Sequence, residues 1–150
     1  MPAIHDISTD TLNPPAFVDV LPIRRWAWNA SAYDGPAVAA QQRHAYPDIR
    51  PLIVPVARDA AHVAVRQLMR AEGWSIVGDE PREGRLEAVA TTPWLRFRDD
   101  VVVRLTAQDE GTRVDMRSKS RIGRNDFGTN ARRVRRFLDR LAARLDGTGR

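Results

Sequence analysis

Apolar and polar residues alternate between Arg85 and Ser120, and this pattern predicts three consecutive β-strands. Each strand keeps its apolar residues on one parity, so each has one apolar face. These apolar residues are Leu86, Ala88 and Ala90, then Val101, Val103 and Leu105, then Val114 and Met116. A turn signal, Asp109-Glu110-Gly111, joins the last two strands over a hairpin-length connection. We therefore expect antiparallel pairing and a sheet with one apolar side.

Two segments have the periodicity of amphipathic helices. One lies between Asp59, a candidate N-cap, and Gly73, a candidate stop, and the other begins near Thr129 or Asn130. Shorter strand patterns are found at 52–56, where Pro55 indicates an edge strand, and at 74–79. The resulting order of strand, helix, four strands and helix predicts an α+β fold. We expect an antiparallel sheet of about five strands with two helices packed on one face.

Residues 1–46 show little periodicity but contain many prolines and five aromatic residues. The aromatic residues are Phe17, Trp26, Trp28, Tyr33 and Tyr46. Disordered segments are usually poor in aromatic residues, so this region is not expected to be a solvated tail. We predict an extended arm, residues 1–46, packed on an α+β domain of residues 47–150. The alternative is an arm that docks on a partner or on a missing segment.

The composition excludes several classes of site. A chain of 150 residues can bury the core of one domain without covalent cross-links. Because there is no cysteine, disulfides, thiolate nucleophiles and cysteine metal sites are excluded. No apolar run approaches the roughly 18 residues typical of a membrane-spanning helix, so we expect a soluble domain. Nothing in the composition distinguishes a cytoplasmic from a periplasmic location.

Positive charge is concentrated at the C-terminal end. Residues 113–150 carry a net charge of +8, whereas residues 1–112 carry −3. A row at four-residue spacing lies on the back of the last predicted helix: Arg132, Arg136, Arg140 and Arg144. This row is either a solvated face or a surface that binds an anionic partner, such as an anionic membrane. Nucleic acid is a less favoured partner, because no aromatic residues or known binding module accompany the row.

A second candidate site surrounds the segment 92–99. Pro93 interrupts the strand pattern, and two large aromatic residues, Trp94 and Phe97, lie among charges. Aromatic and polar groups together could hold a small amphipathic ligand. The candidate ligand-binding residues are Thr92, Trp94, Phe97, Asp99, Arg117, Ser118, Ser120, Arg121 and Asp126. The structural alternative is that Glu87, Arg104 and Asp115 only form cross-strand pairs on the polar face of the sheet. This face is either open to water or covered by the arm.

Patterns typical of catalysis are mostly absent. The sequence has no nucleophile elbow, no glycine-rich phosphate loop and no His-Glu-x-x-His motif, and its three histidines are scattered. We therefore predict no metal site, no cofactor and no catalytic residue. Asp99 and Asp100 are adjacent, so within a strand they point to opposite faces and cannot act together. The enzymatic alternative is a hydrolase or transferase that uses Asp99, Arg117 and Ser120.

Several motifs together resemble one family. They are Asp6–Asp10, Asn13–Phe17, Tyr46–Ile49, Thr91–Arg104, Val114–Asp126 and Gly128–Asn130. They resemble the bacterial and plastid family called domain of unknown function 1499, over nearly the whole chain. This family has no established activity, so the resemblance implies no catalytic residues.

Members of that family are often preceded by membrane-spanning helices. The resemblance therefore implies either the soluble part of a bacterial membrane-associated protein or a short member without the membrane part. Together with the arginine row and the aromatic loop, it favours a non-enzymatic, membrane-associated domain. We expect this domain to bind an anionic surface or a small amphipathic ligand.

Overall fold

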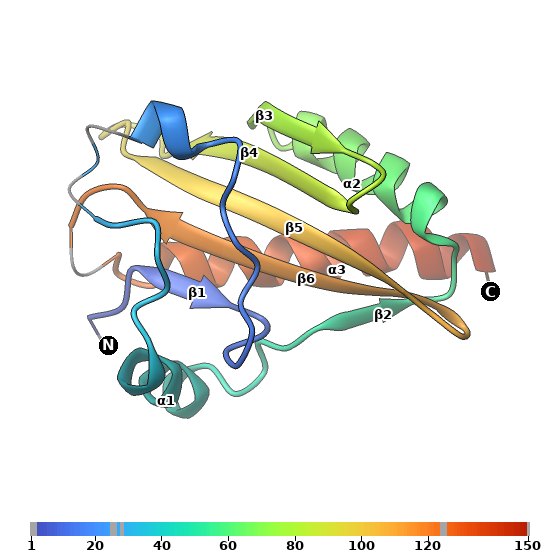
Figure 1. Cartoon of the computed structure of the whole chain (residues 1–150), viewed down its shortest axis with the longest axis horizontal. Helices are drawn as coiled ribbons and strands as arrows, with labels where there is room; N and C mark the ends of the chain where they lie inside the picture. Colours follow the sequence, from blue (N-terminus) through green and yellow to red (C-terminus); the bar gives the residue numbers. More distant parts are fainter. Residues whose placement is uncertain (1–2, 25–26, 28, 124–125, 150) are drawn as a thin grey trace.

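The computed structural model describes residues 3–24, 27, 29–123 and 126–149. Within these ranges it contains six strands, three α-helices and one short 3-10 helix (Figure 1). In chain order they are β1 (Asp6–Ser8), η1 (Leu21–Arg24), α1 (Pro36–Ala45), β2 (Leu52–Val54), α2 (Arg58–Ala71), β3 (Ser75–Glu80), β4 (Arg85–Thr91), β5 (Arg98–Gln108), β6 (Gly111–Ser120) and α3 (Thr129–Gly149). The predicted α+β class and antiparallel sheet are confirmed, whereas the predicted five strands and two helices are too few.

One mixed-length antiparallel sheet forms the centre of the molecule. Its strand order is β1-β6-β5-β4-β3, and β2 also pairs with β6. Since β5 occupies one edge of β6, β1 and β2 share the other edge. β1 lies opposite residues 117–119 and β2 opposite residues 112–114. Pro55 follows β2 directly, in keeping with an edge position.

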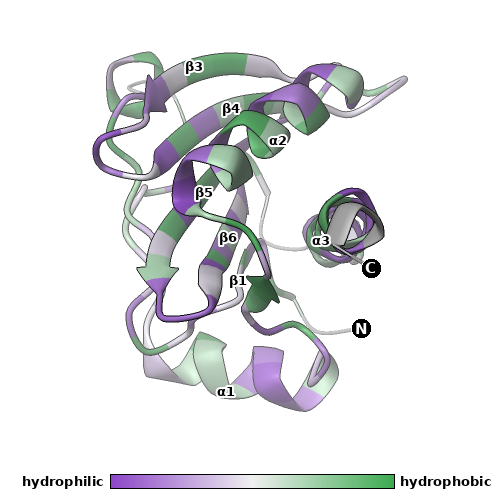
Figure 2. Ribbon diagram, turned by 90° about the vertical axis from the view of Figure 1, so that its right-hand side faces the viewer, coloured by the Kyte–Doolittle hydropathy of each residue, from purple (hydrophilic) through white to green (hydrophobic). Residues whose placement is uncertain are grey.

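The apolar face of the sheet is covered by α2 and α3, which lie behind the strands in Figure 1. Leu86, Val103 and Met116 from three adjacent strands are completely buried against residues of both helices. Burial of each such side chain stabilises the fold by about 1.5–3 kcal/mol. Figure 2, which views the sheet along its strands, shows α3 beside one face and α1 next to the β1 edge.

The bounds of α2 differ slightly from those predicted. The helix begins at Arg58, so Asp59 lies in its first turn and Ala57 occupies the N-cap position. An acidic residue in the first turn is favourable because of the helix dipole. Gly73 follows the helix with a φ of 78°, a left-handed conformation that glycine adopts without steric cost.

The extended arm predicted for residues 1–46 is not confirmed, because the described part of this region contains β1, η1 and α1. α1 starts with Pro36 after Gly35, where the missing N–H of proline is tolerated. The buried Gln42 of α1 joins the helix to β1: its Oε1 accepts the Ser8 N–H at 3.0 Å, and its Nε2 donates to the Ser8 carbonyl at 2.7 Å. We call the described residues between 3 and 46 the N-terminal segment.

The N-terminal segment covers the second face of the sheet, crossing in front of β5 and β6 in Figure 1. Phe17 and Val20 pack on Val102 of β5. The Arg117 guanidinium lies 4.5 Å from the centre of the Phe17 ring. Trp26 and Trp28, two of the aromatic residues that motivated the arm prediction, lie outside the described residues.

Charged side chains are buried between this segment and the sheet. Asp6 accepts two hydrogen bonds from Arg117, both at 2.9 Å, and lies 3.4 Å from the buried Lys119 ammonium. The buried Glu87 carboxylate accepts the backbone N–H groups of residues 18, 19 and 20 at 2.9, 2.7 and 3.3 Å. The N-terminal segment therefore covers the polar face of the sheet, and Glu87 binds the backbone of this segment. Arg104 and Asp115 form the expected cross-strand pair, with 3.5 Å between their charged groups.

Candidate functional site: an arginine-lined groove

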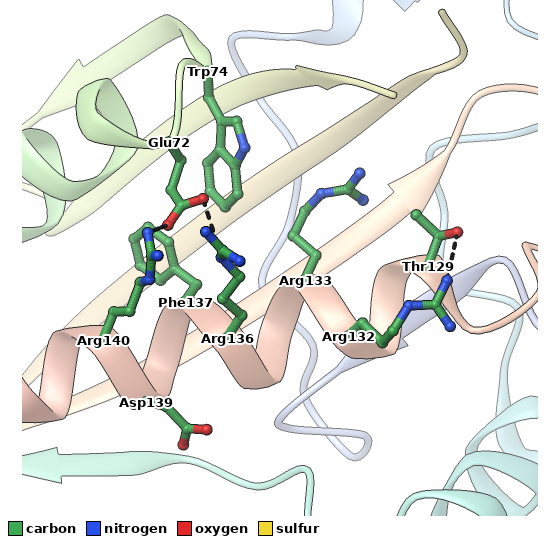
Figure 3. Close-up of a pocket in the computed structure, with 9 residues that line it drawn as sticks. All are labelled: Glu72, Trp74, Thr129, Arg132, Arg133, Arg136, Phe137, Asp139 and Arg140. Carbon is green, nitrogen blue, oxygen red and sulfur yellow. Dashed lines mark hydrogen bonds and ion pairs between the residues drawn. The ribbon is translucent and has the colours of Figure 1, made fainter. Parts of the chain in front are cut away.

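A groove of about 680 Å³ runs between the first half of α3 and the junction of α2 with β3. Figure 3 shows its lining, with the arginines of α3 on one side and the residues that follow α2 on the other. The lining residues are Glu72, Trp74, Thr129, Arg132, Arg133, Arg136, Phe137, Asp139 and Arg140. Binding sites for small molecules commonly have volumes of about 300–1,000 Å³, so the groove has a suitable size.

The floor of the groove is aromatic. The rings of Trp74 and Phe137 stack with centroids 5.1 Å apart and an angle of 17° between their planes. Phe137 is buried in the core, while Trp74 is half-buried at the groove. Such a pair gives apolar contact area next to charged groups.

The guanidinium groups come from the helical spacing of α3. Arg132, Arg136 and Arg140 recur every four residues and so project from one side of the helix. Arg140 donates to Glu72 at 2.6 Å, and the more distant Arg136 lies 3.6 Å from the same carboxylate. Arg132 donates to two neutral oxygens, the Phe127 carbonyl at 3.0 Å and the Thr129 hydroxyl at 3.4 Å.

Arg133 connects the groove to a polar cluster beneath it. Its guanidinium lies 2.7 Å from Asp99 and donates to Asn130 Oδ1 and to Ser118 Oγ. Asn130 in turn donates to Ser120 at 2.8 Å. Burial raises the pKa of Asp99, and the nearby Arg133 acts in the opposite direction. Asp99 already pairs with Arg133. Arg132 and Arg136 are therefore the lining cations best placed to bind an added anion.

The structure distributes the predicted ligand-binding residues over three places. Asp99, Ser118 and Ser120 lie on the helix face of the sheet, in the cluster next to the groove. Arg117 and Arg121 lie on the opposite face, where they bind Asp6 and Asp100. The sheet therefore separates Arg117 from Asp99 and Ser120. These three residues, which the enzymatic alternative requires in one site, do not lie on the same face.

The other predicted residues lie in connections at one end of the sheet. Trp94 and Phe97 are exposed in the β4–β5 loop, which is closed by a hydrogen bond from the Phe97 N–H to the Thr92 hydroxyl at 2.8 Å. Asp126 accepts the N–H groups of Gly128 and Asn130, both at 2.8 Å, and so caps the start of α3.

The predicted arginine row is only partly a groove feature. Arg132, Arg136 and Arg140 line the groove, whereas Arg144 is exposed beyond it. Glu72 and Trp74 line the groove but were not predicted as site residues from the sequence. Both residues flank Gly73, which was predicted from the sequence to end the helix. Their approach to α3 depends on how the two helices pack on the sheet.

A family model described as protein of unknown function (DUF1499) matches residues 6–141 of the chain. The chain belongs to the DUF1499 family. The match includes all six strands of the described residues, the helices α1 and α2, and the groove-lining part of α3. No curated protein matches the chain.

None of the helices in the described part of this DUF1499 chain has the length and apolar content that a membrane-spanning helix needs. Within the same ranges, no three His, Asp or Glu side chains lie close enough together to hold a metal ion.

Proposed function

We propose that this DUF1499 domain is a binding domain whose arginine-lined groove holds the anionic head of a small amphipathic ligand. The observation that carries the proposal is the lining itself, in which four arginines share one groove with a stacked aromatic pair. Guanidinium groups bind carboxylates and phosphates with paired, directional hydrogen bonds. The aromatic floor adds apolar contact for a ligand that is not merely an ion.

The charges of the lining support an anionic ligand. Glu72 is shared by Arg136 and Arg140, and Arg133 is engaged by Asp99. In the described part of the chain, no carboxylate forms an ion pair with Arg132. Arg136 has a side chain that is 62% exposed, so its donors can reach a ligand in the groove.

The test is calorimetric titration of the purified domain with short-chain phosphatidylglycerol below its micelle concentration. Short-chain phosphatidylcholine is the zwitterionic counterpart. We expect phosphatidylglycerol to bind with an affinity at least roughly tenfold higher, and the double variant Arg132→Gln with Arg136→Gln to remove this preference.

The matched control is Arg144→Gln, on the same helix but outside the groove. It removes one positive charge without changing the lining, so it should leave the affinity within about twofold. Equal affinity for the two lipids, or an equal loss in the control and the groove variant, contradicts the proposal. Circular dichroism of each variant checks that α3 stays folded.

A further inference from the structure

Five large hydrophobic side chains are exposed on two neighbouring connections at one end of the sheet. They come from the β4–β5 loop and from the segment between β6 and α3, and we call them the apolar rim: Trp94, Leu95, Phe97, Ile122 and Phe127. The two segments are adjacent, because the Arg121 N–H donates to the Arg98 carbonyl at 3.1 Å beyond the last paired residues of β5 and β6. A cluster of this kind usually marks an interaction surface.

The backbone holds the two most exposed aromatic residues of the rim in a rare conformation. Trp94 has a φ of 66° and Phe127 a φ of 52°, a left-handed region that bulky residues seldom adopt. Their side chains are 97% and 71% exposed. Strain of this sort persists where the surroundings fix it and is often found at functional sites.

Local hydrogen bonds hold the β4–β5 loop and residues 126–130. The Thr92 N–H donates to the Phe97 carbonyl at 2.8 Å, which closes the loop that carries Trp94. On the other segment, Asp126 accepts hydrogen bonds from the N–H groups of Gly128 and Asn130, which follow Phe127 in the sequence. The rim is therefore an outward-facing surface with a defined shape.

Positive charge surrounds the rim. Arg96 and Arg98 are exposed in and beside the β4–β5 loop, and Arg132 is exposed where α3 begins. Tryptophan and phenylalanine next to arginine are typical of surfaces that insert into the boundary between lipid headgroups and acyl chains. Basic residues add attraction to anionic lipids, which favours a membrane over an uncharged apolar surface.

The groove opens next to this rim. Arg132 lines the groove and donates to the carbonyl of Phe127 in the rim. A surface that rests on the rim therefore lies at the Arg132 end of the groove.

From this arrangement we infer that the apolar rim docks on an anionic membrane surface and presents the groove to lipid headgroups. The inference rests on the proposed function for the ligand, which it identifies as an anionic lipid. Trp94 and Phe127 enter the headgroup region, and Arg96 and Arg98 contact lipid phosphates. Arg132 and Arg136 bind a headgroup within the groove.

The test is flotation of the whole chain with vesicles of phosphatidylcholine alone and of phosphatidylcholine with about 30 mol % phosphatidylglycerol. The rim variant is Trp94→Asn with Phe127→Asn, because asparagine tolerates a left-handed backbone and removes the apolar side chain. The control is Leu12→Asn, which removes a side chain that is 93% exposed on the N-terminal segment, outside the rim.

We expect the native chain to float with the anionic vesicles and the rim variant to associate roughly tenfold less. The control should float like the native chain. The rim variant should also keep its affinity for monomeric short-chain phosphatidylglycerol within about twofold, because its groove is unchanged. A fluorescence blue shift on vesicle addition that is lost in Trp94→Asn places that ring in the lipid.

Each contrary result has its own meaning. No flotation of the native chain, or equal flotation of the native chain and the rim variant, overturns the inference and leaves the rim as a surface for a protein partner. Flotation that depends on the rim but not on Arg132 and Arg136, without binding of monomeric phosphatidylglycerol, overturns the groove function and retains the docking surface.

Discussion

Asp99 and Asp100 are neighbours in β5, yet they belong to two different interiors. Asp99 faces the helices and pairs with Arg133 of α3, whereas Asp100 faces the N-terminal segment and binds Arg24 and Arg121. Apart from the polar cluster that contains Asp99, Ser118 and Ser120, the helix face is filled by apolar side chains such as Leu86, Val103 and Met116. The segment face is held by charges and by only a small apolar cluster. Polar alternation along a strand therefore does not imply that the polar face meets water.

The two faces should fail in different ways. Removing one partner of a buried ion pair leaves the other charge buried without compensation, which is strongly destabilising. Removing an apolar side chain costs the lost transfer energy together with a cavity, whatever the pH. The variants below separate these two responses.

The largest effect is expected for Asp6→Asn on the segment face. It preserves the shape of the side chain but leaves Arg117 and Lys119 without their common carboxylate. We expect a loss of about 3–5 kcal/mol in the free energy of unfolding, measured by urea denaturation. A loss below about 1 kcal/mol would mean that water replaces the carboxylate, and that the segment face is not a true interior.

On the helix face, Leu86→Ala should cost about 2–5 kcal/mol. Leu86 is completely buried, and its backbone pairs with Val103. Because no charge is altered, the loss should be the same at pH 5 and pH 7 and at low and high salt. A strong dependence on salt would show that the two faces respond to one another.

Asp79→Asn tests a charge at the margin of the helix face. Asp79 accepts hydrogen bonds from Arg66 at 2.5 and 3.1 Å and lies 2.6 Å from His62. The Arg66 hydrogen bond is the main cause that lowers the pKa of Asp79 to about 2 from its ordinary 3.8; burial opposes it and the hydrogen bond from His62 assists it.

Because the folded state favours the charged form of Asp79, its contribution is fully present above the ordinary pKa and is lost as the pH falls towards 2. The carboxylate is 30% exposed. We therefore expect Asp79→Asn to cost about 1 kcal/mol near pH 6 after solvent screening, and clearly less near pH 2, where the carboxyl of the folded protein is about half protonated. Thermal melts across this pH range measure the difference, and a constant difference would exclude the ion pair as its source.

The smallest effect is expected for Asp48→Asn at the surface. Asp48 accepts two hydrogen bonds of 2.6 Å from Arg135 of α3, which hold its pKa below the ordinary value. Both side chains are well exposed, so the pair should contribute only about 0.2–1 kcal/mol and less at high salt. Urea denaturation beside Asp6→Asn gives the direct contrast between an exposed and a buried carboxylate. A loss as large as that of Asp6→Asn would remove the distinction.

The elements that form the helix face are well predicted from the sequence, because their apolar residues recur at regular intervals. β3–β6, α2 and α3 follow from alternation and from the apolar stripes of the helices. β1 has only three residues, which is too short for a pattern to be recognised. α1 is rich in alanine and glutamine and has no apolar stripe, and its position depends on hydrogen bonds from Gln42 to Ser8.

For the candidate sites, the sequence shows which residues share a side but not what lies opposite them. The arginine row of α3 was visible from its spacing, whereas Trp74 and Glu72 reach it only through the packing of α2 and α3. Parity also holds a signal that the enzymatic hypothesis overlooked. Arg117 and Ser120 are three residues apart in β6, so they must point to opposite faces of a strand.

The edge of β6 that β1 and β2 share influences the order in which parts of the protein fold. β1 is synthesised before the other strands, and Asp6 binds Arg117, which follows 111 residues later. Until the β5–β6 hairpin has left the ribosome, β1 has no strand to pair with and the carboxylate of Asp6 stays in water. We therefore expect the N-terminal segment to close over the sheet late in folding, because its contacts are the least local in the molecule. The residues of β1 precede the other strands of this domain in the sequence, yet they are among the last of its residues to become ordered.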